Sequence, residues 1–291
     1  MGGSEVRMRL QRRRQDATIG PALLMRTRLV PFLRGLGNLF VVCGLGIGIQ
    51  PLLHRLLPGP AAGPLSAAVL LALYLAGARW IEGRRAVELR ADDSARGIGV
   101  GLVSGIGLFS SVMGILWLAG VYRPAGWGNW QPLALALLSA LASAVFEEVI
   151  FRGFLFRLAA RLGGNWIALG VTSALFGLAH IANPGATWAS ALAVAIEAGI
   201  LLGAAYAASG SLWLPIGIHA GWNFAEGPVF GMEVSGHAGT GGWIGGQLQG
   251  PAILTGGAFG PESSIVAVVV CLVLATFYLR KMSRVDPTLV S

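Results

Sequence analysis

The chain has 291 residues, of which 55% are hydrophobic and 12% are charged, and its mean hydropathy is +0.70. Soluble domains carry about 25% charged residues, so the composition excludes an ordinary soluble domain and indicates a membrane protein. The net charge is +8, but the basic residues, all but one of them Arg, lie in short segments between apolar runs. We interpret this pattern as a topology signal and expect no nucleic-acid partner.

In chain order, residues 1–34 contain eight Arg and are expected to form a basic cytoplasmic tail. One all-α transmembrane domain is expected over residues 35–284, and residues 285–291 form a second short tail. A spanning helix needs about 20 apolar residues. The sequence therefore predicts about eight of them, at roughly 35–54, 61–80, 98–120, 132–158, 165–182, 187–208, 212–230 and 262–280.

The distribution of Arg predicts the orientation of this bundle. With the N-terminus inside, most Arg residues fall on the cytoplasmic side, whereas Arg55 and Arg123 do not. We therefore expect an integral protein of a bacterial inner (plasma) membrane, with the lipid bilayer as a partner and both termini in the cytoplasm. The Gly-rich segment 227–262 is expected to be an external or re-entrant loop.

Ionisable residues interrupt the predicted helix 132–158. A charged side chain at the bilayer centre costs about 2.5–3.5 kcal/mol, so such residues are functional by default. Glu148 and Arg152 are four residues apart and can pair on one helical face, whereas Glu147 is turned by about 100° toward another neighbour. Arg157 is expected to extend to the cytoplasmic interface. The alternative is an ion cluster that only fixes helix packing.

Two histidines and an asparagine lie in other apolar helices, His180 in 165–182 and His219 with Asn223 in 212–230. Each alone is more typical of hydrogen-bonded packing. Together with the Glu pair they supply a base, a metal ligand or acid, and an oxyanion donor. Glu197 either lines the same cavity or packs against a partner.

Linear counting raises one difficulty for a single site. From the cytoplasmic side, Glu147, His219 and His180 lie at depths of about 16, 10 and 22 Å at 1.5 Å per residue. A separation of Glu147 from both imidazoles greater than about 10 Å would exclude a shared site.

Three motifs now occur in a fixed order: Glu-Glu-x-x-x-Arg at residues 147–152, Phe-x-x-x-His at 176–180 and His-x-x-x-Asn at 219–223. They resemble the motifs of the CAAX-protease and bacteriocin-processing (CPBP, Abi) family of intramembrane metalloproteases, which is related to the type II CAAX prenyl endopeptidases. The resemblance covers roughly residues 132–228. The stretch Gly256–Ser263 also looks like a recurrent feature of some bacterial members, and the sequence assigns it no physical role.

The resemblance implies hydrolysis of a peptide bond within the membrane. Glu147 and His180 would activate a water, His219 and Asn223 would stabilise the oxyanion, and Arg152 would hold Glu148. No cofactor is certain. A divalent metal such as zinc on His180, His219 and Glu147 is an alternative, although no His-Glu-x-x-His helix is present.

Other interpretations stay open at this stage. The substrate would be a peptide or a membrane-protein tail, lipidated or not. The same charges could instead serve an ion or proton relay in a transporter, which is a frequent use of intramembrane Glu and His. A catalytically silent immunity or scaffold protein of the same fold is the third alternative.

Overall fold

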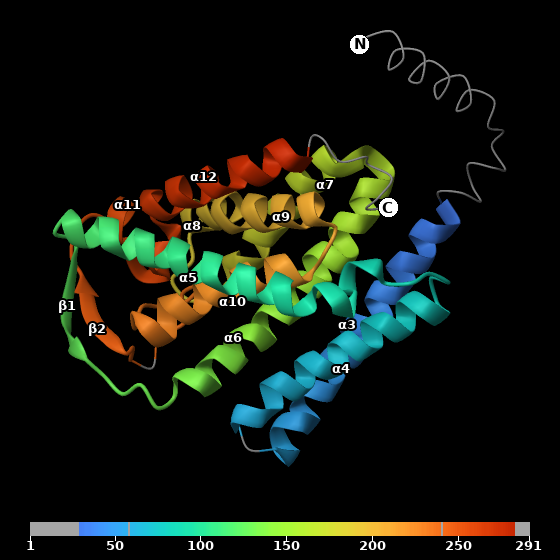
Figure 1. Cartoon of the computed structure of the whole chain (residues 1–291), viewed down its shortest axis with the longest axis horizontal. Helices are drawn as coiled ribbons and strands as arrows, with labels where there is room; N and C mark the ends of the chain where they lie inside the picture. Colours follow the sequence, from blue (N-terminus) through green and yellow to red (C-terminus); the bar gives the residue numbers. More distant parts are fainter. Residues whose placement is uncertain (1–28, 58, 240, 283–291) are drawn as a thin grey trace, which may run out of the picture.

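The computed structural model describes residues 29–57, 59–239 and 241–282. Most of the predicted N-terminal tail and all of residues 285–291 lie outside this part of the chain. The α-helices are α3 (Val30–Leu56), α4 (Gly59–Trp80), α5 (Ser94–Leu118), α6 (Leu133–Glu148), α7 (Arg157–Ala179), α8 (Trp188–Val194), α9 (Leu201–Ser209), α10 (Trp213–Phe224), α11 (Ala252–Thr255) and α12 (Ile265–Met282). They form the bundle in Figure 1.

Three π-helical segments continue these helices: η4 (Val149–Phe156) after α6, η6 (Ala195–Ile200) between α8 and α9, and η7 (Ala225–Val229) after α10. Short 3₁₀ turns complete the helical structure: η2 (Val87–Leu89), η3 (Ala91–Asp93), η5 (His180–Ala182), η8 (Gly257–Phe259) and η9 (Pro261–Ser263). Segments of π-helix occur frequently at functional sites.

The prediction of a helical membrane bundle is confirmed. Six helical stretches of the described chain are long and apolar enough to cross a bilayer: 30–53, 61–80, 91–118, 133–182, 188–209 and 265–282. The stretch 133–182 has 50 residues, or about 75 Å of helix at 1.5 Å per residue, which is more than twice the thickness of a hydrocarbon core of about 30 Å. It therefore cannot be one straight crossing.

This long stretch reverses direction at Gly164. Its φ of 80° and ψ of 175° are not helical, and a residue without a β-carbon adopts this positive φ at little cost. After the reversal α7 packs against η4, which precedes it. Glu147 lies 17 residues before Gly164 and His180 lies 16 residues after it, so the two side chains return to a similar depth of about 25 Å from the turn.

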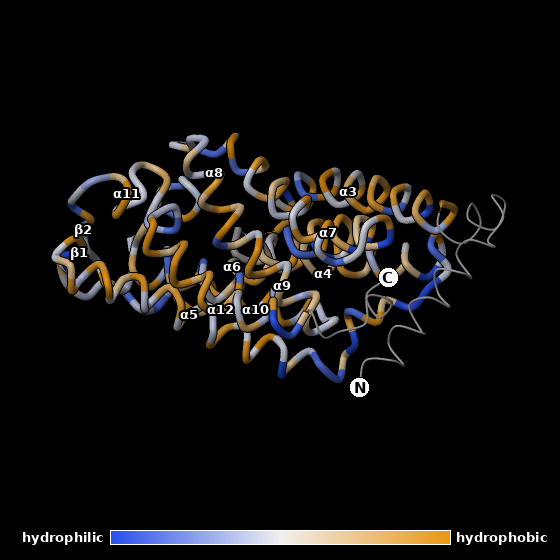
Figure 2. Tube along the Cα trace, turned by 90° about the horizontal axis from the view of Figure 1, so that it is seen from above, coloured by the Kyte–Doolittle hydropathy of each residue, from blue (hydrophilic) through white to orange (hydrophobic). Residues whose placement is uncertain are grey.

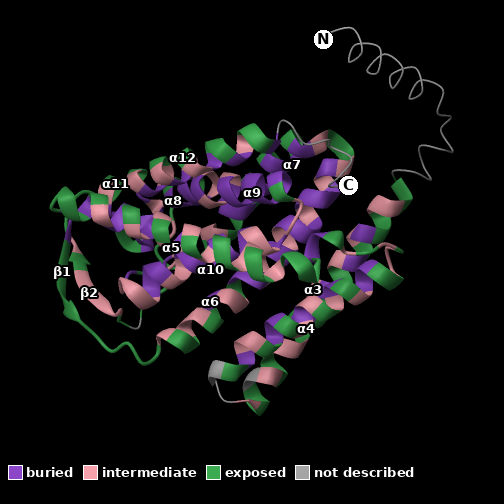
Figure 3. Ribbon diagram, in the orientation of Figure 1, coloured by how far each residue is buried: buried purple, intermediate pink, exposed green. Residues whose placement is uncertain are grey.

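The centre of the bundle is the stretch 188–209, in which 72% of the most apolar 18-residue window is buried, whereas only 17% of the corresponding window in α3 is buried. Figure 3 shows this contrast between α9 and the peripheral pair α3 and α4. Hydrophobic residues also run along the outer helices in Figure 2. Exposed apolar side chains such as Phe40 and Val273 belong to faces that lipid would cover.

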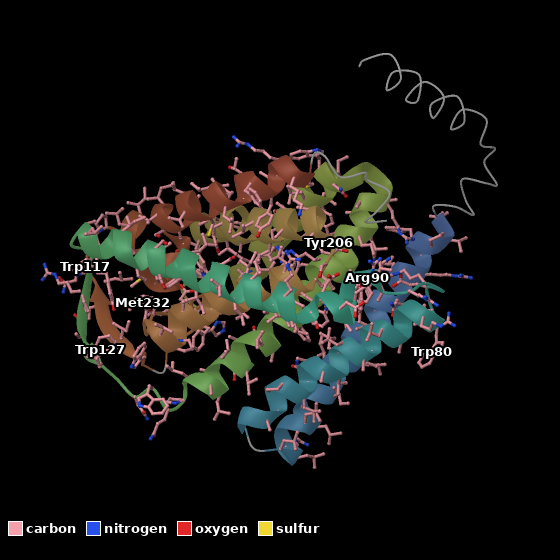
Figure 4. All side chains as sticks on the ribbon, in the orientation of Figure 1. Trp80, Arg90, Trp117, Trp127, Tyr206 and Met232 are labelled. Atoms are coloured by element: carbon pink, nitrogen blue, oxygen red, sulfur yellow. The ribbon has the colours of Figure 1, made fainter. Side chains whose placement is uncertain are left out.

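The Gly-rich segment is not structureless, because it contains β2 (Ile244–Leu248), α11 and two 3₁₀ turns. Strand β2 pairs antiparallel with β1 (Tyr122–Trp127), with Tyr122 opposite Leu248. This two-stranded sheet lies at one end of the bundle with Trp127 and Met232, and Trp80 and Arg90 lie at the opposite end (Figure 4). The side of the membrane on which each end lies stays a prediction.

Arg157 differs from its prediction. It is buried, with Nη1 2.8 Å from Glu82 Oε2 and Nε donating to the carbonyl oxygen of Gly153 at 3.0 Å. Arg84 and the amide of Asn38 also bind Glu82. Because Glu82 follows α4 and compensates the charge, Arg157 has no need to extend to the interface, and the pair joins the peripheral helices to the centre of the bundle.

Helix α10 lies in close contact with α5. Gly101 and Gly105 of α5 face Gly217 and Gly221 of α10, and a β-carbon added at Gly105 would overlap the backbone at Ile218. Small residues allow two helix backbones to approach in this way. The contact fixes the position of the helix that carries His219 and Asn223.

Candidate active site

The six residues predicted from the motifs come from the ends of three helical stretches. Glu147 and Glu148 are the last residues of α6, Arg152 lies on η4, His180 follows α7, and α10 contributes the others. The structure brings three ionisable side chains, Arg152, His180 and His219, within 4.0 Å of Glu147 or Glu148. The single-site hypothesis therefore passes its distance test.

Glu148 is the buried anchor of this site. Its Oε1 accepts hydrogen bonds from Arg152 Nη1 at 2.8 Å and from His219 Nδ1 at 3.0 Å, and both members of the ion pair are fully buried. Arg152 Nη2 donates to the carbonyl oxygens of Ala198 and Gly199 at 3.3 Å. Its guanidinium also lies 4.7 Å from the ring centroid of Phe176, a cation–π distance. The predicted pairing of Glu148 with Arg152 is confirmed.

Glu147 points to a different set of partners, as its position on the helix predicts. Its Oε2 lies 3.9 Å from His219 Nε2 and 4.0 Å from His180 Nε2. Ser143 Oγ lies 3.4 Å from Oε1, whereas Oε2 is buried and has no hydrogen-bond partner within the described chain. One carboxylate oxygen is therefore available for a water or a substrate.

Both imidazoles are oriented through their Nδ1 atoms. The carbonyl oxygen of Phe176 lies 2.7 Å from His180 Nδ1 and accepts its proton, and Glu148 does the same for His219. A neutral imidazole carries one N–H. These bonds consequently turn both Nε2 atoms toward Glu147.

The histidines also line a small inner cavity of about 30 Å³. Its polar lining residues are His180, Glu197, His219, Asn223, Ser235 and Glu262, and the rest of its wall is apolar or aromatic, including Phe176 and Trp222. The amide of Asn223 makes no hydrogen bond to the described residues, so it is available to a ligand. Glu147 lines a separate groove of about 370 Å³ with residues of α3, α4 and α6.

Sequence reasoning left some of this cavity out. It offered two roles for Glu197, lining the cavity or packing against a partner, and both are found, because Glu197 lines the cavity and the Cys271 thiol donates to its Oε2 at 3.4 Å. It did not predict that Trp222, Ser235 and Glu262 share the wall. The available signal for Glu262 was the Gly256–Ser263 stretch, which contains it. The residues that this stretch contacts in the folded protein lie far from it in the sequence.

The geometry bears on the predicted zinc site. Ligands bonded to a tetrahedral zinc at about 2.0–2.1 Å lie about 3.3 Å from one another. The two gaps at Glu147 Oε2 are 3.9 and 4.0 Å, and no group of three or more His, Cys, Asp or Glu side chains in the described segments has an arrangement that could hold a metal. A zinc ion on His180, His219 and Glu147 stays a prediction.

Comparison with known families gives one match. Residues 129–225, about a third of the chain, match the family described as type II CAAX prenyl endopeptidase, Rce1-like. The matched segment contains all six predicted site residues and ends before Glu226. No curated protein and no solved structure matches the chain.

Proposed function

We propose that this chain hydrolyses a peptide bond with a water held by Glu147 and His180, because residues 129–225 match the Rce1-like family of type II CAAX prenyl endopeptidases. The family is one of membrane proteases, which supports an intramembrane endopeptidase. One observation carries the residue assignment: the unpartnered Oε2 of Glu147 lies 3.9 and 4.0 Å from the two oriented Nε2 atoms.

These gaps suit a bridging water. Two groups that hydrogen-bond to one water lie about 4–5 Å apart. The water donates one proton toward Glu147 Oε2 and the other toward His180 Nε2. As its oxygen attacks the carbonyl carbon, a proton passes to Glu147, and the same proton is delivered to the amine nitrogen when the C–N bond breaks.

His219 and Asn223 are suited to hold the oxyanion. Glu148 accepts the Nδ1 proton of His219, so a protonated His219 presents its second N–H on Nε2. The free amide of Asn223 supplies a further donor from the next turn of the same helix. Preorganised donors of this kind contribute about 10²–10³-fold to the rate. Arg152 holds Glu148 in place by their ion pair and through it orients His219.

The direct test uses the full chain in lipid nanodiscs. Membrane-protein C-termini are compared by mass spectrometry after incubation with wild-type protein and with Glu147→Gln, which removes the base and keeps the shape. We expect the cleaved termini to disappear in the variant, a loss of about 10²–10⁴-fold. Glu233→Gln, in the exposed loop, is the matched control. Unchanged cleavage by Glu147→Gln would refute the proposal.

The substrate class and the metal need separate measurements. Peptides with and without a prenyl group on a cysteine, otherwise identical, show whether a lipid is recognised. Elemental analysis of the purified protein, combined with chelation, decides between water activated by side chains and the alternative zinc. An enzyme that is active without metal favours water activated by side chains. Stoichiometric metal together with loss of activity on chelation favours zinc.

The relay transporter is the second candidate, because Glu197 and Glu262 extend the row of ionisable groups beyond the histidines. A relay predicts ion or proton flux in proteoliposomes without cleavage, and tolerates Glu147→Asp better than a hydrolase does. A silent scaffold predicts that its function survives Glu147→Ala.

A further inference from the structure

A polar groove separate from the cavity of the histidines leads to Glu147. It lies where α4 packs against α3 and α6 (Figure 1), and we call it the α6 groove. Its volume of about 370 Å³ falls within the usual range for ligand pockets, about 300–1,000 Å³. The Glu147 side chain is 27% exposed, so a ligand in this groove can reach it. The polar lining residues are Gln50, Ser66, Ser139, Ser143 and Glu147.

Three of these side chains form a row along α6. Ser139, Ser143 and Glu147 follow one another at intervals of four residues, so they share a helical face and lie about 6 Å apart along the axis. Ser139 Oγ donates to the carbonyl oxygen of Leu135 at 3.1 Å, and Ser143 Oγ donates to Glu147 Oε1 at 3.4 Å. Each hydroxyl oxygen therefore keeps a lone pair for another donor. An extended peptide advances about 3.3 Å per residue, so every second residue of such a peptide would meet this row.

A second wall of the α6 groove carries Gln50 of α3. Gln50 lies within the apolar stretch 30–53 and is half-buried. Its amide makes no hydrogen bond to the residues that the structure describes, whereas the neighbouring Ser66 Oγ donates to the carbonyl oxygen of Ala62 at 2.8 Å. A primary amide offers two donors and one acceptor. The Gln50 side chain is therefore available to a ligand that carries both kinds of group, as a peptide backbone does.

A peptide that is cleaved within a membrane needs such partners. The N–H and C=O groups of an extended backbone have no partners within their own segment, and leaving them unpaired in hydrocarbon is costly. Non-helical backbone at this depth is tolerated only where protein or a cavity surrounds it. The α6 groove supplies hydroxyl and amide groups from two walls, and the small residues Gly63, Ala67 and Ala142 leave room between them.

We propose that the α6 groove binds the substrate backbone in an extended conformation and that Gln50 is a substrate-binding residue. Backbone groups of the substrate pair with Ser139 and Ser143 on one side and with the Gln50 amide on the other. The scissile carbonyl group reaches Glu147, where the row ends. From Ser139 to Glu147 the helix rises about 12 Å, which gives room for about four extended residues. This assignment rests on the proposed protease function. Gln50 itself lies outside the segment that matches the family.

Binding is tested first, without any need for catalysis. The Glu147→Gln protein in nanodiscs is titrated with the peptide acetyl-Ala-Leu-Ala-Leu-amide and with its depsipeptide analogue, in which ester oxygens replace the inner N–H groups. We expect the peptide to raise the unfolding temperature saturably and to bind about tenfold more tightly than the analogue.

Variants in the same Glu147→Gln background locate the binding. Gln50→Leu should weaken it by about threefold to tenfold, and Ala142→Phe, which fills the groove, should abolish it. Ala134→Phe is the matched control, because Ala134 is exposed on the same helix, and it should leave binding unchanged. Equal binding of the peptide and its analogue, or equal binding of the peptide by Gln50→Leu, Ala142→Phe and the parent protein, overturns the proposal.

Steady-state cleavage then tests the link to the substrate. With Glu147 intact, Gln50→Leu should raise KM by about threefold to tenfold and leave kcat nearly unchanged, because its amide binds the ground state and the transition state alike. A fall in kcat together with the unfolding temperature would assign Gln50 a structural role and overturn its assignment. Cleavage that depends on Glu147 but is equally fast in Ala142→Phe overturns the groove and leaves the protease. Absence of any cleavage that depends on Glu147 refutes the protease, while the peptide titration still decides whether the groove binds a backbone.

Discussion

Replacement of Arg152 by Met removes one partner of a fully buried ion pair. Because Arg152 and Glu148 are 0% exposed and 2.8 Å apart, the remaining carboxylate has no solvent and keeps only the His219 imidazole as a partner. Loss of one partner of such a pair costs about 3–5 kcal/mol of unfolding free energy. Glu148→Leu should cost a similar amount, for it leaves the guanidinium uncompensated.

The double variant Glu148→Leu/Arg152→Met separates pairing from position. We expect it to be no less stable than either single variant, because the buried charges disappear together, so the two losses fail to add by at least about 2 kcal/mol. All three variants should lose activity, since the loss of Glu148 removes the acceptor of His219 Nδ1 and the loss of Arg152 removes the guanidinium that holds this acceptor in place. A double variant that restores stability and remains inactive would assign Glu148 a positioning role.

Unfolding is measured by circular dichroism during titration with dodecyl sulfate. Activity is measured as cleavage at the termini that were identified with wild-type protein. Arg123→Met is the control, because Arg123 is exposed on β1 and a surface replacement changes stability by only about 0.5 kcal/mol. Additive losses in the double variant would refute the interaction. Activity retained in Arg152→Met would refute the positioning role.

Further predictions concern His180, Asn223 and the ionic network around Glu82. His180→Gln should lower kcat by about 10²–10⁴-fold. Asn223→Ala should lower kcat by about 10²–10³-fold with little change in KM, because the Asn223 amide acts on the transition state. Steady-state kinetics of the two variants measures both effects. Burial alone would raise the pKa of Glu82, but Arg157, Asn38 and Arg84 lower it below its ordinary value. Ionised Glu82 therefore stabilises the fold at pH values above its pKa in the unfolded chain, and this stabilisation is lost as the pH falls through its lower pKa in the folded protein. Glu82→Gln should flatten this part of the stability curve between about pH 5 and 3, and an unchanged curve would contradict it.

The residues that the sequence predicted correctly are those whose contacts are local or occur in a motif. Glu148 and Arg152 pair at i and i+4, which helix geometry alone requires. The depth mismatch arose because the helix continues past Arg157 to the reversal at Gly164, and an apolar run of this kind does not mark its own turning point. Once that turn is known, the depths of Glu147 and His180 agree.

Other contacts had no local signal. Arg157 was predicted to extend to the interface because its partner Glu82 lies 75 positions earlier in the chain. Glu262 joins the cavity only because positive-φ glycines turn the chain between two segments that contact distant helices. The π-helical segments also follow from tertiary packing, and nothing in their composition distinguishes them from α-helix.

The last prediction tests how far the site depends on the approach of α5 to α10. A side chain at Gly105 would overlap the backbone at Ile218 and Trp222, whereas one at Gly107 meets nothing within 4 Å. Gly105→Val should displace α10, widen the 3.9 Å gap between His219 and Glu147, and reduce kcat/KM by about 10²-fold, the usual effect of a 1 Å misplacement. Gly107→Val makes the same replacement on the same helix and should retain activity. Equal activity of the two variants, at unchanged helix content, would show that the α5–α10 contact does not set the site geometry.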